Sequence, residues 1–135
     1  PAFVNAPLSF SVSHSGEYWV CALSSGTVGL DIEQHRPCPM DSIARRFFTS
    51  SERQFLQGRD SSDFFDVWTA KESHVKFCGT GILEHFSSFT IADANGLYSS
   101  LDHCVFKRIG IDPAYSCTLC SDRPRPIGLI YMNEE

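Results

Sequence analysis

The sequence lacks an apolar run of the ~20 residues that a membrane-spanning helix needs, and it also lacks any block of basic residues. Its 11 Lys and Arg stand against 16 Asp and Glu, and the resulting net charge of −5 argues against a binding surface for duplex nucleic acid. We therefore expect a soluble protein that acts neither on a nucleic-acid polymer nor in a membrane. Any phosphate group that it handles must be met by local side chains.

The six cysteines lack the close, repeated spacing of a disulfide framework or a zinc site. Cys117 and Cys120 have the spacing of a zinc knuckle, but no second pair follows them, and residues three apart in a strand point to opposite faces. The 11 Phe, 4 Tyr and 2 Trp can fill a core without cross-links. We therefore expect reduced thiols in a cytoplasmic protein.

Three strands are expected in the first quarter of the chain. In residues 8–14 apolar side chains such as Phe10 and Val12 alternate with serines, which predicts a strand with its apolar face buried. Residues 18–23 form a short apolar run between turn residues, and residues 27–33 alternate again. This pattern is typical of an antiparallel sheet.

Helices are expected in the middle of the chain. Residues 41–48 predict a short helix, and a second begins with a capping box at Thr49 or Ser50 and ends at Gly58. The longest helix runs from Ser61 or Ser62 to Gly79. The fold class expected is therefore α+β: an antiparallel sheet with a long helix and one or two short helices packed on it. Further strands are expected at 87–92, 103–109, 115–120 and 127–132.

Charged residues in the longest helix can meet two carboxylates of the third strand. Asp31 and Glu33 project from one face of that strand, and Glu72 joins them if the helix crosses the sheet. Carboxylate oxygens with open positions are what Mg²⁺ binds, usually together with substrate phosphates. Lys71 and Lys76 could then neutralise the remaining phosphate charge. The pattern predicts a site for a diphosphate.

Simpler interpretations exist for these residues. Glu72 and Lys76 are four apart, so they could form a solvated salt bridge worth a few tenths of a kcal/mol. In that case the acidic group is a surface without a ligand. The remaining histidines, His74 and His103 among them, share no spacing and are interpreted as surface groups.

Several motifs in order resemble the 4′-phosphopantetheinyl transferases, and in particular their Sfp-type members. The two principal strings are VGLDIE at 28–33 and WTAKES at 68–73, with Lys76 after the second. The string FSVSHSG at 10–16 resembles a further motif of that type, and the strings at 45–52 and 112–115 match it too. Together the motifs cover nearly the whole chain.

The resemblance implies transfer of 4′-phosphopantetheine from coenzyme A to a serine of an acyl carrier protein or a peptidyl carrier domain, with release of adenosine 3′,5′-bisphosphate. Carried over to this chain, Asp31, Glu33 and Glu72 would hold Mg²⁺ on the diphosphate. Lys76 would contact the phosphates and stabilise the leaving group.

The resemblance also implies residues for the nucleotide and for proton transfer. Ser13 and His14 would bind the 3′-phosphate of coenzyme A, and Lys71 would lie by the nucleotide. For the general base, Glu72 or a metal-bound water is the first choice and Glu52 is the alternative. The structure expected is one half of a pseudo-two-fold transferase fold.

Sfp-type enzymes resemble two similar halves with the active site between them. In this chain residues 1–16 would be the closing segment of a largely absent N-terminal half, and residues 17–135 would be the C-terminal domain. A face meant for the other half would then be uncovered, and it could recruit that half or a second copy of the chain. The alternative function is a catalytically silent fragment that still binds coenzyme A or a carrier domain.

Overall fold

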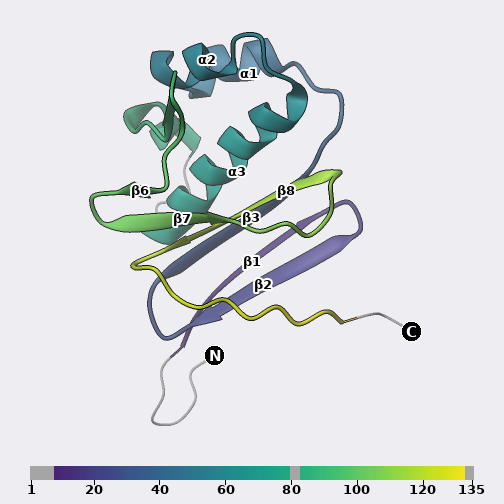
Figure 1. The fold of residues 1–135 in the computed structure, drawn as a ribbon, viewed down its shortest axis with the longest axis vertical. Coiled ribbons are helices and arrows are strands. Elements are labelled where there is room, and N and C mark those ends of the chain that lie inside the picture. Colours follow the sequence, from purple (N-terminus) through teal and green to yellow (C-terminus); the bar gives the residue numbers. More distant parts are fainter. Residues whose placement is uncertain (1–7, 80–82, 133–135) are drawn as a thin grey trace.

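The largest sheet of the protein has four antiparallel strands in the order β3, β8, β7, β6 (Figure 1). The computed structural model of the chain describes residues 8–79 and 83–132. The expected α+β class is confirmed. The strands are β3 (Val28–Gln34), β6 (Ser100–Leu101), β7 (Cys104–Arg108) and β8 (Tyr115–Ser121).

Three α-helices lie between β3 and β6 in the described part of the sequence. Figure 1 shows two of them stacked at one end of the molecule, while the long third helix runs from them along the sheet. In the ranges that the structure describes, no helix is both long enough and apolar enough to cross a membrane. The helices are α1 (Met40–Phe47), α2 (Ser50–Leu56) and α3 (Ser61–Cys78).

Side-chain caps define where the helices begin and end. The capping box is confirmed at Thr49, whose hydroxyl accepts from the Glu52 N–H while the Glu52 carboxylate accepts from the Thr49 N–H. The long helix is capped by Asp60 instead of a serine, because its carboxylate reaches the N–H groups of the next residues. Gly79 ends this helix in the left-handed region, with φ of 74°.

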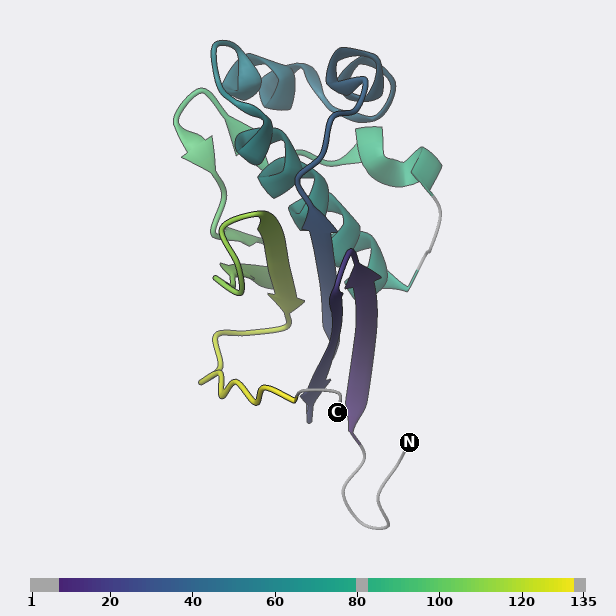
Figure 2. The same ribbon diagram turned by 90° about the vertical axis from the view of Figure 1, so that its right-hand side faces the viewer.

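The first two strands form a separate hairpin, and its apolar side chains do not point in the direction that we expected. β1 (Ser9–Ser15) pairs with β2 (Tyr18–Ser24), and Figure 2 shows this hairpin beside β3. The alternation of β1 was predicted to bury Phe10 and Val12, but both are exposed and the serines face inward. The reason is that the serine hydroxyls bind the backbone of β3.

Three serines of β1 satisfy the side of β3 that β8 does not reach. The hydroxyl oxygens of Ser11, Ser13 and Ser15 accept from the N–H groups of Leu30, Ile32 and Gln34, at 2.9, 3.1 and 2.9 Å. A buried N–H without an acceptor is costly, so the serines are selected for this inner face. Side chains of β2, including Val20, pack with Ile32, which points to the face of β3 opposite that of Asp31.

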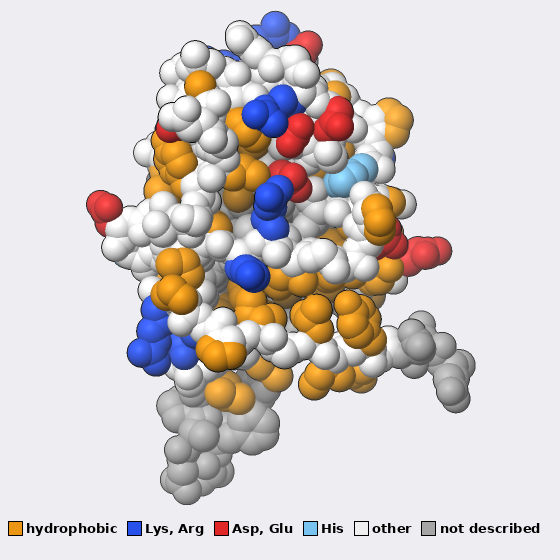
Figure 3. Space-filling view, in the orientation of Figure 1, with side chains coloured by type: hydrophobic (Ala, Val, Ile, Leu, Met, Phe, Trp, Pro, Cys, Tyr) orange, Lys and Arg blue, Asp and Glu red, His pale blue; other side chains and the backbone are white. Residues whose placement is uncertain are grey.

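Two further expectations about strands were wrong. Residues 87–92 were predicted as one strand, but a 3-10 helix covers Leu83–Ser88, and only the two-residue β4 (Ala92–Asp93) pairs with β5 (Gly96–Leu97). Residues 127–132 have no strand, and their large apolar side chains are exposed. Figure 3 shows apolar side chains gathered over the lower part of this face, where Figure 1 places the C-terminal segment.

Candidate functional site

The candidate site exists because α3 lies in direct contact with β3. Gly29 makes this approach possible: a Cβ atom at that position would lie 2.1 Å from the Ser73 carbonyl oxygen and 2.5 Å from the Phe77 nitrogen. Any side chain would push the helix away from the strand. The glycine of the VGLDIE string therefore sets the distance at which Glu72 and Lys76 meet Asp31.

Asp31 stands at the centre of the site, on the face of β3 that α3 covers. It is 5% exposed, and its Oδ1 accepts from the Ser13 hydroxyl at 3.1 Å and from Lys76 Nζ at 3.3 Å. Its Oδ2 is buried and has no hydrogen-bond partner. A buried carboxylate oxygen normally has a partner, so Oδ2 is the atom of this site that is best suited to bind a cation.

The electrostatics of the site favour the binding of a cation. Burial raises the pKa of Asp31 to about 7, and the carboxylates of Glu33 and Glu72 add to this effect while Lys76 opposes it. Burial also raises the pKa of Glu33 and of Glu72, and Glu33 raises that of Glu72 further. Three acids that interact unfavourably in this way are stabilised as carboxylates by a bound cation.

The three carboxylates are neighbours, but they are not gathered to a closed coordination shell. Oxygens from Asp31, Glu33 and Glu72 do not all lie within 4.8 Å of one another. The two glutamates are only half-buried, whereas Asp31 is held by its hydrogen bonds. The donor set of three carboxylate oxygens is the one that Mg²⁺ prefers, and the unpartnered Asp31 Oδ2 gives it a fixed point.

Lys76 connects three parts of the site. Its ammonium group donates to the Leu30 carbonyl oxygen at 2.9 Å and to the Val12 carbonyl oxygen and Asp31 Oδ1 at 3.3 Å each. The simple interpretation paired Lys76 with Glu72, but its salt bridge is to Asp31. The Lys76 side chain is 30% exposed, whereas that of Lys71 is fully buried. Within the protein the three contacts of Lys76 use the three donors of its ammonium group, so a ligand would have to replace one of these acceptors.

Lys71 and Glu52 do not belong to this site, which corrects two of our interpretations. Both side chains are 0% exposed, and Lys71 Nζ donates to Glu52 Oε1 and Oε2 at 2.8 Å each and to the Phe89 carbonyl oxygen at 2.7 Å. These contacts use all three donors of the ammonium group. Glu52 further accepts from the backbone of Thr49 and Ile91. The pair is a buried link between α2, α3 and the segment just before β4, and neither side chain is exposed to a ligand in solvent.

Ser13 and His14 are adjacent in β1 and therefore face opposite sides of the hairpin. Ser13 is buried, donates to Asp31 and accepts from Ile32, so its hydroxyl is occupied within the protein. Its expected role as a phosphate ligand stays a prediction. His14 is exposed and stacks on Trp19, with ring centroids 4.3 Å apart. The imidazole stays accessible to an anion in solvent.

Two neighbours of Glu33 were not assigned to the site from the sequence. The Trp68 indole forms a hydrogen bond with Glu33, and Arg36 attracts it; both lower its pKa against the effect of burial. Trp68 precedes Glu72 by four residues, and this one-turn spacing in α3 is the signal that could have marked it. Trp68 and Arg36 therefore stabilise the charged form of the Glu33 side chain.

The arrangement can bind a cation on its carboxylates and can place an ammonium group next to the bound ion. An anionic ligand bridging the two would have its charge neutralised from both sides. Groups of this kind are suited to phosphate chemistry.

Comparison with known proteins gives a consistent result. Residues 27–120 match the family model described as the 4′-phosphopantetheinyl transferase superfamily. The chain is 37% identical over 125 residues to the 4′-phosphopantetheinyl transferase psf-1 of Bacillus pumilus, covering 85% of this chain and 53% of that protein. It is 33% identical over 125 residues to the 4′-phosphopantetheinyl transferase Sfp of Bacillus subtilis (strain 168), covering 85% and 55%.

A third relative gives the same coverage. The chain is 34% identical over 133 residues to the 4′-phosphopantetheinyl transferase gsp of Aneurinibacillus migulanus, which covers 88% of this chain and 54% of that protein. The chain thus spans about half the length of the curated relatives that it matches. The matched residues include Asp31, Glu33, Glu72 and Lys76.

Proposed function

The chain belongs to the 4′-phosphopantetheinyl transferase superfamily, and on this basis we propose that it transfers the 4′-phosphopantetheine group of coenzyme A to a serine of an acyl- or peptidyl-carrier protein. The reaction would depend on Mg²⁺ and release adenosine 3′,5′-bisphosphate. The observation that supports this proposal most directly is Asp31, whose buried Oδ2 lacks a partner beside two further carboxylates and a lysine.

We assign the metal to Asp31, Glu33 and Glu72. When bound, Mg²⁺ supplies the positive charge that polarises a diphosphate and compensates the charge of the departing phosphate. Asp31 is the fixed ligand, because the Ser13 hydroxyl and Lys76 hold its other oxygen. Ser13 is therefore a positioning residue in this proposal.

Lys76 and Glu72 have complementary roles in the transfer step. The serine Oγ of the carrier attacks the phosphorus next to pantetheine, and the bond from that phosphorus to the oxygen of the adenosine bisphosphate breaks. Lys76 neutralises the oxygens on which charge develops. Glu72 accepts the serine proton as the general base. His14, exposed on the hairpin, contacts the 3′-phosphate.

Mass spectrometry tests the proposal directly. A carrier protein incubated with coenzyme A, Mg²⁺ and this chain should gain the mass of one phosphopantetheine. Glu72→Gln should abolish the gain while leaving thermal unfolding nearly unchanged, because a half-buried carboxylate near others is unfavourable without its cation. Glu17→Gln, in the exposed turn of the β1–β2 hairpin, is the matched control and should transfer at the unaltered rate.

The alternative is a silent fragment that binds coenzyme A or a carrier domain without transfer. The fact in its favour is that the chain spans about half the length of its relatives. Calorimetry with coenzyme A separates the two: binding without a mass gain, unaffected by Glu72→Gln, favours the fragment. If coenzyme A does not bind and the carrier protein gains no mass, both functions are refuted. If neither binding nor mass gain depends on Mg²⁺, the acidic group is an ordinary surface without a metal.

We further propose that the exposed face of the β1–β2 hairpin packs against a second domain of the same family, either in the same polypeptide or in another copy of the chain. The outer side chains of this face are apolar; Trp19 is 75% exposed, Leu23 62% and Phe10 52%. An apolar patch of this kind is typical of an interface. Sedimentation of the chain before and after Trp19→Ser should show any self-association and its loss, whereas a monomer at all concentrations would exclude the second copy.

A further inference from the structure

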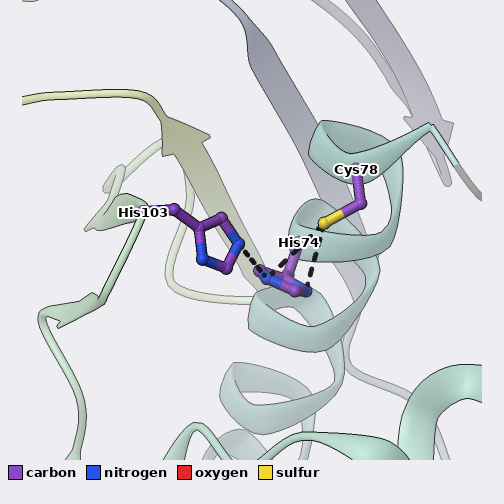
Figure 4. A group of neighbouring side chains, drawn as sticks. All are labelled: His74, Cys78 and His103. Carbon is purple, nitrogen blue, oxygen red and sulfur yellow. Dashed lines mark hydrogen bonds between the residues drawn. The ribbon is translucent and has the colours of Figure 1, made fainter.

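A cluster of nitrogen and sulfur ligands lies near the end of α3. His74 and Cys78 are one turn apart on the helix, and His103 reaches toward them from the turn between β6 and β7 (Figure 4). One ligand atom from each of the three residues lies within 4.8 Å of the other two. Within the described ranges no other group of His, Cys, Asp and Glu is gathered to this distance.

The distances agree with tetrahedral coordination. His74 Nε2 lies 3.3 Å from His103 Nε2 and 3.6 Å from Cys78 Sγ. Zinc binds imidazole nitrogen at about 2.0–2.1 Å and thiolate sulfur at about 2.3 Å, so two ligands at the tetrahedral angle stand about 3.3 Å apart for two nitrogens and about 3.6 Å for nitrogen and sulfur. The pairs around His74 already have these separations.

The surroundings favour a neutral imidazole at the centre of the cluster. His74 is buried, and its ring lies 4.3 Å from that of Phe89. Burial beside an apolar ring disfavours a charged imidazole, and a metal needs the unprotonated ring as its ligand.

We propose that His74, Cys78 and His103 form a binding site for a thiophilic divalent transition metal, with Zn²⁺ as the best match. Binding replaces the Cys78 S–H bond by a metal–sulfur bond, and the proton is released to solvent. Cys78 and His103 are both exposed, so an ion can reach the cluster from solvent. The metal would tie the β6–β7 turn to the last turn of α3, which also contains Lys76.

This site is chemically distinct from the acidic one. Nitrogen and thiolate ligands select zinc and related metals, whereas carboxylate oxygens select Mg²⁺. The inference therefore stands whether or not the chain transfers phosphopantetheine. A test can use the same difference, because an excess of Mg²⁺ occupies oxygen sites without competing for the thiolate.

Cobalt serves as the spectroscopic probe for this test. Reduced protein is titrated with Co²⁺ in excess Mg²⁺, and we expect a thiolate-to-cobalt charge-transfer absorption that saturates at one ion per chain and is displaced by Zn²⁺. Cys78→Ser should remove the absorption. His103→Asn should weaken Co²⁺ binding by more than about 100-fold. Loss of a residue that only hydrogen-bonds to a metal ligand already lowers metal affinity by up to that factor, and His103 is proposed as a direct ligand.

The controls separate a lost site from a lost fold. Cys78 and His103 are exposed, so their replacement opens no core cavity, and circular dichroism of each variant should match that of the unaltered protein. Cys21→Ser replaces an exposed cysteine in β2 and should keep the full absorption. As a second readout, Zn²⁺ should raise the unfolding temperature of the unaltered protein and not that of Cys78→Ser. An unaltered protein without the absorption, or its persistence in Cys78→Ser, would overturn the proposal.

Discussion

Replacement of Asp31 by asparagine should stabilise the protein at alkaline pH. The pKa of Asp31 is raised from 3.8 to about 7 in the folded chain, and an acid with a higher pKa in the folded than in the unfolded state binds its proton more tightly when folded. The free energy of unfolding therefore falls as the pH rises from about 4 to 7, and the full reduction is present above pH 7. Asparagine cannot ionise and escapes this loss.

The size of the effect follows from the shift. Each pKa unit corresponds to about 1.4 kcal/mol, so ionised Asp31 lowers the free energy of unfolding by about 4 kcal/mol. Asparagine also leaves Lys76 without its counter-charge, and we therefore expect a gain of roughly 2–4 kcal/mol at pH 8 relative to pH 4. For a chain of this size the unfolding temperature should rise by on the order of 10 °C.

Thermal unfolding at a series of pH values measures this difference. Asp31→Asn is compared with the unaltered protein and with Glu17→Gln, an exposed control that should show no such pH dependence. Mg²⁺ should stabilise the unaltered protein at pH 8 and have little effect on Asp31→Asn. A difference between the two proteins that does not change with pH, or a loss of stability at pH 8 in Asp31→Asn, would refute the reasoning and make Asp31 a structural partner of Lys76.

Three further substitutions test the packing around the site. Gly29→Ala should lower the free energy of unfolding by about 3 kcal/mol or more, because its methyl group meets backbone atoms of α3, whereas Gly110→Ala, which meets nothing within 4 Å, should be nearly neutral in the same urea titration. Lys71→Met should lower the free energy of unfolding by about 3–5 kcal/mol, because the buried Glu52 carboxylate loses its counter-charge. A loss below about 1 kcal/mol would show that the pair is not desolvated. Ser13→Ala should cost about 1–3 kcal/mol by chemical unfolding because the Ile32 N–H loses its acceptor, and no loss would mean that water replaces the hydroxyl.

Local patterns predicted much of the fold. The bounds of α3 follow from a cap at one end and Gly79 at the other, and the capping box at Thr49 can be read directly from the sequence. Alternation located the β1 strand but assigned its faces the wrong way round. A period of two identifies two faces without showing which one meets the protein, and here hydrogen bonds to β3 favour the serine face.

The candidate site was predicted only in part, because periodicity shows which side chains share a face but not what each of them contacts. Asp31, Glu33, Glu72 and Lys76 come together because strand and helix periodicity place them on facing surfaces. Lys71 was expected beside them, but adjacent helix residues point in different directions, and its charge is balanced by a residue on another helix. The cluster at His74 includes His103, which lies in a turn almost thirty residues later in the chain. Helix spacing alone could show only that Cys78 lies one turn from His74.

The serine contacts between β1 and β3 also affect how the protein opens. Strands joined by side-chain hydroxyls separate without breaking a backbone ladder, so the β1–β2 hairpin can detach as a unit while β3 stays paired with β8. The amide protons of Leu30, Ile32 and Gln34 would then exchange with deuterated water together, ahead of those that bond to β8. The same movement would uncover Asp31 from the side of Ser13, and it would open a route by which ions reach the most deeply buried carboxylate of the site.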